Sequence, residues 1–151
     1  MSIDNRLTEL GITLPAAPAP AANYVPFTRS GNLVFVSGQI SQDENGLIKG
    51  RLGDGMEVTQ GAAAARRCGL ALLAQVKAAT GSLDRVQRVV KLTGFVNSTP
   101  DFTDQPEVIN GCSDLFGEVF GKAGQHARAA VSVPSLPRGV AVEIDAIFEV
   151  E

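Results

Sequence analysis

A strictly alternating run near the C-terminus, residues 140–150, constrains the fold of this chain more than any other feature. Every second position is apolar, and these positions are Val140, Val142, Ile144, Ala146, Phe148 and Val150. Side chains of a β-strand point alternately to its two faces, so the pattern predicts a strand with one face against a hydrophobic core. The other face carries Glu143 and Asp145, which predicts a sheet with a second, more polar face.

Three further segments are predicted to be strands. Residues 32–40 and 89–98 are rich in β-branched and aromatic residues, which favour the pleated surface of a sheet. Residues 127–133 are expected to form the strand before the alternating run. Asn45-Gly46 predicts a hairpin turn after the first of these three segments, with Leu47 and Ile48 beginning the return strand.

Two long helices are expected between the strands, at residues 57–80 and 105–120. Apolar side chains recur there at three- and four-residue steps, which gives a helix one buried face. Gly81 and Gly121 stand where each helix would stop. A short helix is predicted at residues 3–10.

The order of elements is therefore β-β-α-β-α-β-β, which predicts an α+β fold with one mixed sheet and two helices packed on one face. The open face is expected to hold Arg128, Glu143 and Asp145 among apolar side chains such as Ala130 and Phe95, and to be an association surface. The chain's 151 residues suit a single domain. Pro and Ala dominate residues 14–24, so we divide the chain into an N-terminal arm, 1–22, and a domain, 23–151.

Composition argues against several classes of function. Thirteen Lys and Arg against sixteen Asp and Glu give a net charge of −3 and no basic run, unlike a nucleic-acid-binding protein. No apolar stretch approaches the roughly 20 residues that span a bilayer, and MSIDNRLTEL lacks the apolar core of a signal peptide. We therefore expect a cytoplasmic protein without membrane or nucleic-acid partners.

Few residues suit metal binding or nucleophilic catalysis. Cys68 and Cys112 both fall within helical apolar patterns, and His126 is the only histidine. Buried cysteines usually act as small hydrophobic residues, and one histidine with two separated cysteines does not make a usual zinc site. The sequence thus predicts no metal and no hydrolase triad, with His126 as a loop residue.

The last two predicted strands raise the main question about function, because both carry charges among apolar residues. If they pair as neighbours, Arg128 of one lies near Glu143 and Asp145 of the other. A structural ion pair is one interpretation. The other is a binding site, in which the guanidinium grips a foreign carboxylate and Glu143 holds or deprotonates a water.

At these residues the sequence resembles the Rid (reactive intermediate deaminase) proteins, also known as the YjgF-type or L-PSP family. The resemblance covers roughly residues 20–151. It is carried by Ser37-Gly38-Gln39-Ile40, by Asn110 followed by Phe116, by Arg128-Ala129-Ala130-Val131 with Leu136-Pro137, and by Glu143-Ile144-Asp145-Ala146-Ile147. The N-terminal arm is longer than in the short members of that family.

The resemblance implies a chorismate-mutase-like fold and a homotrimer with ligand clefts between subunits. It also implies hydrolysis of reactive 2-imino or 2-enamino acids to 2-keto acids and ammonia, without a cofactor. Water attacks an iminium carbon that is already electrophilic, so such a site has chiefly to orient its reactants.

The resemblance also assigns roles to five residues of this chain. Arg128 matches the arginine that grips the substrate carboxylate, and Glu143 matches the glutamate associated with the attacking water. Tyr24, Ser37 and Asn110 match residues in or near the cleft. Each of these three has a structural alternative: Tyr24 as an anchor for the arm, Ser37 as a partner for a backbone group, and Asn110 as a helix-surface residue.

Two other functions compete with an imine deaminase. The first is a non-catalytic trimer that binds small carboxylic acids in a regulatory role. The second is the ribonuclease activity once attributed to related proteins, against which the acidic charge and the lack of a basic patch count.

Overall fold

The alternating run forms β7 (Val142–Val150), which lies in the middle of a five-stranded sheet. The protein is described by a computed structural model that covers residues 2–20 and 22–151. The strand order is β1-β2-β7-β5-β6, with β1 at Phe27–Ser30, β2 at Leu33–Ile40, β5 at Val86–Asn97 and β6 at Ala127–Val133. Only β5 and β6 pair in parallel, so the sheet is mixed, as predicted.

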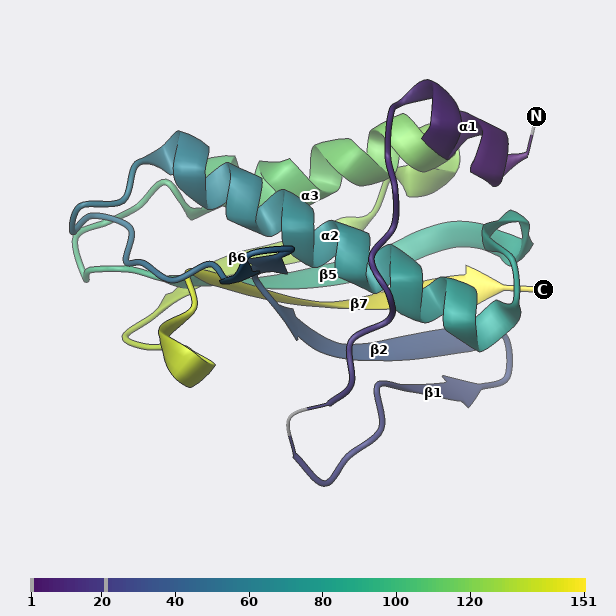
Figure 1. Cartoon of the computed structure of the whole chain (residues 1–151), viewed down its shortest axis with the longest axis horizontal. Coiled ribbons are helices and arrows are strands. Elements are labelled where there is room, and N and C mark those ends of the chain that lie inside the picture. Colours follow the sequence, from purple (N-terminus) through teal and green to yellow (C-terminus); the bar gives the residue numbers. More distant parts are fainter. Residues whose placement is uncertain (1, 21) are drawn as a thin grey trace.

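Two long helices, α2 (Val58–Thr80) and α3 (Gln105–Phe120), cover one face of this sheet (Figure 1). The apolar row of β7 that faces them is almost fully buried. Gly111 of α3 lies against Ala62 of α2, where a Cβ atom would collide with the Ala62 carbonyl oxygen. The glycine therefore allows the two helices to pack closely. The predicted α+β architecture, with both helices on one face of the sheet, is confirmed.

The first hairpin differs from the prediction. Residues 27–30, for which the sequence pattern predicts no element, form β1 and pair antiparallel with β2 across Gly31, whose φ of 58° is readily adopted by glycine. The turn predicted at Asn45-Gly46 is present, but it joins two strands of only two residues, β3 (Gln42–Asp43) and β4 (Gly46–Leu47), in a separate sheet.

The last two strands do not pair with each other, so the arrangement considered for Arg128 and Glu143 is not met. β5 lies between β6 and β7 and pairs with both. A helical crossover through α3 brings β6 parallel to β5, the usual way of joining parallel strands, and β7 then occupies the gap between β2 and β5.

This strand order puts the two candidate residues on opposite faces. Arg128 is level with Leu92 and Ala146, which point toward the helices, whereas Glu143 is level with Phe95 and Val131 on the open face. Our expectation that Arg128 and Ala130 belong to the open face is therefore wrong; Ala130 packs against the core. Glu143 and Asp145 do lie on the open face, which also exposes Phe35 and Val131.

The N-terminal segment is fixed to the helical layer. It begins with α1 (Ile3–Glu9), close to the predicted short helix, whose Leu7 is buried and whose Arg6 Nε donates to the Glu118 carbonyl oxygen at 2.8 Å. An extended stretch then crosses α2 and descends past the edge of the sheet (Figure 1).

Both cysteines are buried free thiols in the core, as predicted. Within residues 2–20 and 22–151, no helix is long and apolar enough to cross a bilayer.

Candidate functional site

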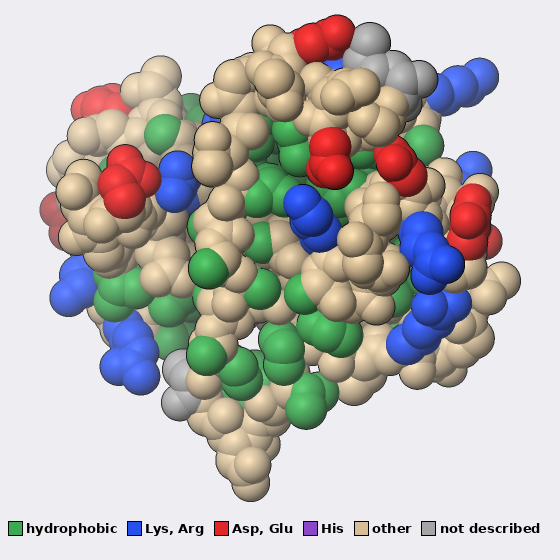
Figure 2. All heavy atoms as spheres, turned by 45° about the vertical axis from the view of Figure 1, so that its right-hand side comes forward, with side chains coloured by type: hydrophobic (Ala, Val, Ile, Leu, Met, Phe, Trp, Pro, Cys, Tyr) green, Lys and Arg blue, Asp and Glu red, His purple; other side chains and the backbone are tan. Residues whose placement is uncertain are grey.

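A cleft of about 700 Å³ opens where the N-terminal arm passes the end of β2. Three segments form it: the arm, the C-terminal half of β2, and the short 3₁₀ turn η3 (Pro137–Gly139) that precedes β7. Figure 2 shows hydrophobic side chains gathered on the lower part of one face of the molecule. Three of the five predicted site residues line the cleft, namely Tyr24, Ser37 and Glu143.

Glu143 reaches the cleft because β2 is irregular opposite it. The register of β2 against β7 shifts between Val36 and Gln39, which brings Ile40 opposite Glu143. A Cβ atom on Gly38 would stand 2.5 Å from Glu143 Oε2. Gly38 of the SGQI segment thus leaves room for the Glu143 carboxylate beside β2.

The environment of Glu143 favours its neutral form. Desolvation, and secondly the charge of Asp145, raise the pKa of the Glu143 carboxyl above its ordinary value. Among the described residues no hydrogen bond or ion pair occupies this carboxylate. A half-buried carboxyl group with a raised pKa and no fixed partner is suited to taking up and giving back a proton.

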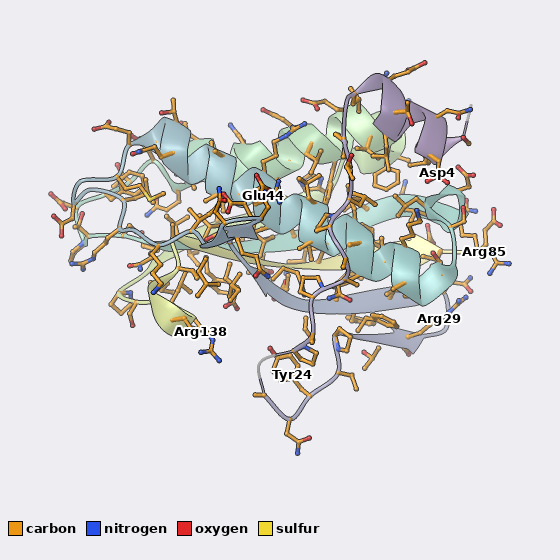
Figure 3. All side chains as sticks on the ribbon, viewed as in Figure 1. Asp4, Tyr24, Arg29, Glu44, Arg85 and Arg138 are labelled. Atoms are coloured by element: carbon orange, nitrogen blue, oxygen red, sulfur yellow. The ribbon has the colours of Figure 1, made fainter. Side chains whose placement is uncertain are left out.

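Ser37 bonds to the segment before β1, and Tyr24 lies at the mouth of the cleft. The Ser37 hydroxyl donates to the Val25 carbonyl oxygen at 2.8 Å, and its backbone N–H donates to Pro26 at 2.9 Å. Ser37 therefore satisfies a backbone group, which is the structural alternative we had considered. Tyr24 is half exposed at the mouth, on the side of the sheet away from α2 and α3 (Figure 3).

Arg128 lies outside the cleft, at the β6 edge of the sheet. Its Nη1 donates to Ser113 Oγ at 2.9 Å and its Nη2 to the Pro106 carbonyl oxygen at 3.2 Å, both on α3. No carboxylate of the described residues lies within ion-pair distance, so the alternative of a structural ion pair with Glu143 or Asp145 is wrong. A guanidinium has five N–H donors, and the two bonds leave others free for a ligand.

Asn110 belongs to the same edge. It is exposed on α3, four residues after Pro106 and three before Ser113. Residues at these steps share one side of a helix, so Asn110 stands between the two groups that hold Arg128.

His126 supports this arrangement, a role that the sequence did not reveal. Its Nδ1 is 2.6 Å from the Gly124 carbonyl oxygen and its Nε2 is 2.9 Å from Ser113 Oγ. Because a carbonyl only accepts, Nδ1 carries the hydrogen, and in the neutral ring Nε2 then accepts from the Ser113 hydroxyl. The hydroxyl oxygen is left to accept from Arg128, so the chain His126–Ser113–Arg128 orients the guanidinium.

Arg138 is the other residue that sequence reasoning missed. It lines the cleft together with Glu143, and it is the one non-glycine residue of the described chain with positive φ (φ 60°, ψ 14°). Figure 3 shows it projecting from η3 on the same side of the sheet as Tyr24. The available signal was its place between Pro137 and Gly139, a tight-turn composition.

The five predicted residues therefore form two groups. Tyr24, Ser37 and Glu143 belong to the cleft, while Arg128 and Asn110 belong to the β6 edge on the opposite face. Within residues 2–20 and 22–151 no group of three or more potential ligand side chains is placed to hold a metal ion.

Comparison with known proteins gives a consistent match along the whole chain. Residues 4–148 match the family described as "YjgF/chorismate mutase-like, putative endoribonuclease". Protein TCP17 of Trypanosoma cruzi is 55% identical over 145 residues, covering 95% of this chain and 91% of that protein. A protein of Dermatophagoides farinae named 2-iminobutanoate/2-iminopropanoate deaminase is 29% identical over 142 residues, covering 93% and 95%.

Solved structures agree with this match. The protein Atu1372 from Agrobacterium tumefaciens superposes with a TM-score of 0.91 at 50% identity, covering 99% of this chain and 92% of that one. The structure of E. coli TdcF with bound serine gives a TM-score of 0.64 at 28% identity, covering 89% and 94%.

Proposed function

We propose that this protein, which belongs to the Rid (YjgF-type) family, hydrolyses reactive 2-imino or 2-enamino acids to 2-keto acids and ammonia. The observation that carries the proposal is the Glu143 carboxyl group, which lines a cleft of about 700 Å³ without a hydrogen-bond partner among the described residues. The relative named 2-iminobutanoate/2-iminopropanoate deaminase and the serine bound to TdcF support a small amino-acid-like substrate.

The chemistry requires two groups to act on one substrate. Glu143 accepts a proton from water as the water oxygen bonds to C2 of the iminium. Glu143 returns this proton to the nitrogen and takes the proton of the new C2 hydroxyl as the carbon–nitrogen bond breaks, so that the C2–oxygen bond becomes the carbonyl of the 2-keto acid. Ammonia leaves and accepts the second proton, which gives ammonium. Arg128 binds the substrate carboxylate through paired N–H donors and fixes C2 in front of the water.

These two groups can meet only across copies of the chain. Arg128 and Glu143 lie on opposite faces of one sheet, so one chain cannot present both to a small molecule. A ring of identical subunits, in which the β6 edge of one copy faces the cleft of the next, satisfies this requirement. The exposed apolar residues of the open face, such as Phe35 and Val131, are available for the contact. We therefore include the homotrimer, with clefts between subunits, in the proposal.

The activity is tested by following imine decay after an amino-acid oxidase has generated 2-imino acids in the presence of the purified protein. We expect acceleration by the wild-type protein and a loss of ten- to hundred-fold in kcat/KM for Arg128→Ala. Equal decay with and without the protein, across a range of imino acids, would contradict the proposal. Retained binding of 2-keto acids in that case would favour the non-catalytic carboxylate-binding trimer.

The sharing of the site between copies is tested by mixing two inactive variants, Arg128→Ala and Glu143→Gln, under conditions in which subunits exchange. A site regains both groups when its arginine comes from one variant and its glutamate from the other. In a randomly mixed cyclic trimer this happens at about a quarter of the sites. Recovery of about that share of wild-type activity is expected, whereas no recovery despite verified exchange would place both groups in one chain.

A further inference from the structure

We infer that the N-terminal arm is a specificity wall of the cleft, positioned by the buried side chain of Gln75, and that it makes the site prefer 2-imino acids with an extended apolar side chain. This inference rests on the proposed function, because it names the substrate class of the same site. The wall consists of Pro18, Ala19, Pro20 and Ala22, all of which line the cleft with Glu143.

The anchor of the wall is an amide in an otherwise apolar part of α2. Gln75 is 1% exposed, among buried Leu, Ala and Val side chains. Its Nε2 donates to the Pro18 carbonyl oxygen at 2.6 Å. Burying an amide is unfavourable unless it is hydrogen-bonded, and this bond goes to a segment 57 residues away in the chain. Gln75 therefore fixes the arm at the position where the arm reaches the cleft.

The same anchor is connected to the catalytic side of the cleft. Gln75 Nε2 also lies 3.4 Å from Gln39 Oε1, and Gln39 Nε2 donates to the Ser37 carbonyl oxygen at 2.9 Å. Gln39 is itself 6% exposed. The hydrogen-bond chain thus runs from the arm through two buried amides to the irregular part of β2, where Gly38 adjoins Glu143. The distance between the wall and Glu143 is consequently set by rigid parts of the fold.

The chemistry of the wall decides the substrate class. It presents only proline and alanine side chains, and Ile40 and Leu47 line the cleft with it. Proline restricts the backbone, so the wall keeps its shape. The cleft volume of about 700 Å³ is in the range of pockets that hold drug-sized ligands, far more than a three-carbon imino acid fills. A longer apolar substituent on C3 of the substrate would contact this wall, while the carboxylate and C2 stay at Arg128 and Glu143.

Replacing Gln75 by leucine tests the anchor. Gln75→Leu removes the donor to Pro18 but suits a buried helix position. Gln87→Leu is the matched control, since Gln87 donates to Glu151 at the far end of the sheet. Hydrogen exchange of residues 14–24 should rise in Gln75→Leu and stay at the wild-type level in Gln87→Leu. Unchanged exchange of these residues in Gln75→Leu would overturn the anchoring role.

The specificity is read from two substrates made in place by an amino-acid oxidase, 2-imino-4-methylpentanoate from leucine and 2-iminopropanoate from alanine. A methylene in an apolar pocket changes discrimination by roughly tenfold or more. We therefore expect Gln75→Leu to lower the ratio of the two kcat/KM values about five- to tenfold, with 2-iminopropanoate little affected. If hydrogen exchange shows that the arm is released in Gln75→Leu but the ratio of the two kcat/KM values is unchanged, the arm does not act as a specificity wall.

Ala19 is not needed for the anchor, so Ala19→Phe provides an independent variant should Gln75→Leu fail to fold. It narrows the cleft from the wall itself. It should reduce turnover of the longer substrate and spare the shorter one; equal effects on both would contradict the inference.

A binding measurement separates failure of this inference from failure of the proposed function. Tyr24 is the only tyrosine, the chain has no tryptophan, and Tyr24 lines the cleft, so intrinsic fluorescence reports occupancy there. Titration with 2-keto acids of increasing apolar length should give rising affinity in the wild-type protein and a flat series in Gln75→Leu, even if no imine is hydrolysed. Tighter binding of 2-oxoglutarate than of any apolar 2-keto acid would overturn the inference while leaving deamination intact.

Discussion

The two halves of the proposed site hold their charged groups in opposite ways. Glu143 lies in a half-buried cleft with no hydrogen-bond partner among the described residues, and its pKa is raised by this desolvation. Arg128 is held by Ser113 and Pro106, and through Ser113 by His126. The difference corresponds to their tasks: a proton-transfer group must change its charge easily, whereas a binding group must keep one direction.

The largest expected effect comes from removing the titratable group of the cleft. Glu143→Gln keeps the shape but cannot accept a proton, and positioned acid–base groups contribute 10²- to 10⁴-fold to rate. We expect a loss of about 10²-fold or more in kcat/KM, measured by imine decay. Loss of the same size in 2-keto-acid affinity, with kcat preserved, would mean that Glu143 is a binding group instead.

Glu143→Gln should raise the stability of the folded protein, although it lowers activity. Because the pKa of Glu143 is raised in the folded protein, the folded state binds more protons than the unfolded state between the ordinary and the raised value. Stability due to this group therefore falls as pH rises through that window. Glu143→Gln should unfold at a higher denaturant concentration than the wild type at neutral pH, and the difference should shrink as pH falls below the ordinary range of a glutamate.

An intermediate effect on activity is expected from a change at Gly38, which leaves room for the Glu143 side chain. In Gly38→Ala the new Cβ atom would collide with Glu143 Oε2, and the flexible carboxylate must move aside. Activity should fall about tenfold, since small misplacements of a catalytic group are costly, while the free energy of unfolding changes little. The double variant Gly38→Ala/Glu143→Gln should then be no less active than Glu143→Gln alone; further loss would show that Gly38 acts independently.

The smallest effect belongs to the β6 edge. Ser113→Ala removes one of the bonds that orient Arg128 but leaves the guanidinium charge. We expect KM to rise a few-fold with kcat nearly unchanged, because carboxylate binding stabilises ground and transition states alike. Ser113→Thr, which retains the hydroxyl, should restore much of the wild-type KM. If alanine and threonine behave alike, the His126–Ser113–Arg128 chain does not position the arginine.

The sequence predicted local structure well because local structure depends on residue periodicity. The alternation of residues 140–150 indicated which side of β7 is buried, and the helical stripes located α2 and α3. Periodicity says nothing about which strands become neighbours, so it did not reveal that β5 separates β6 from β7, and Arg128 was assigned to the wrong face. Residue periodicity also could not predict the role of Gln75, because its hydrogen-bond partner, Pro18, lies 57 residues away in the sequence. The roles of Tyr24, Ser37 and Asn110, and the boundary between arm and domain, stay predictions.

The central place of β7 has a consequence for how the protein can be made. Both of its neighbours, β2 and β5, precede it in the chain, and without it the sheet would fall into two separate pairs, β1-β2 and β5-β6. A nascent chain must therefore emerge from the ribosome past Val150 before its sheet can close. A premature stop just before Val142 would delete the middle of the fold.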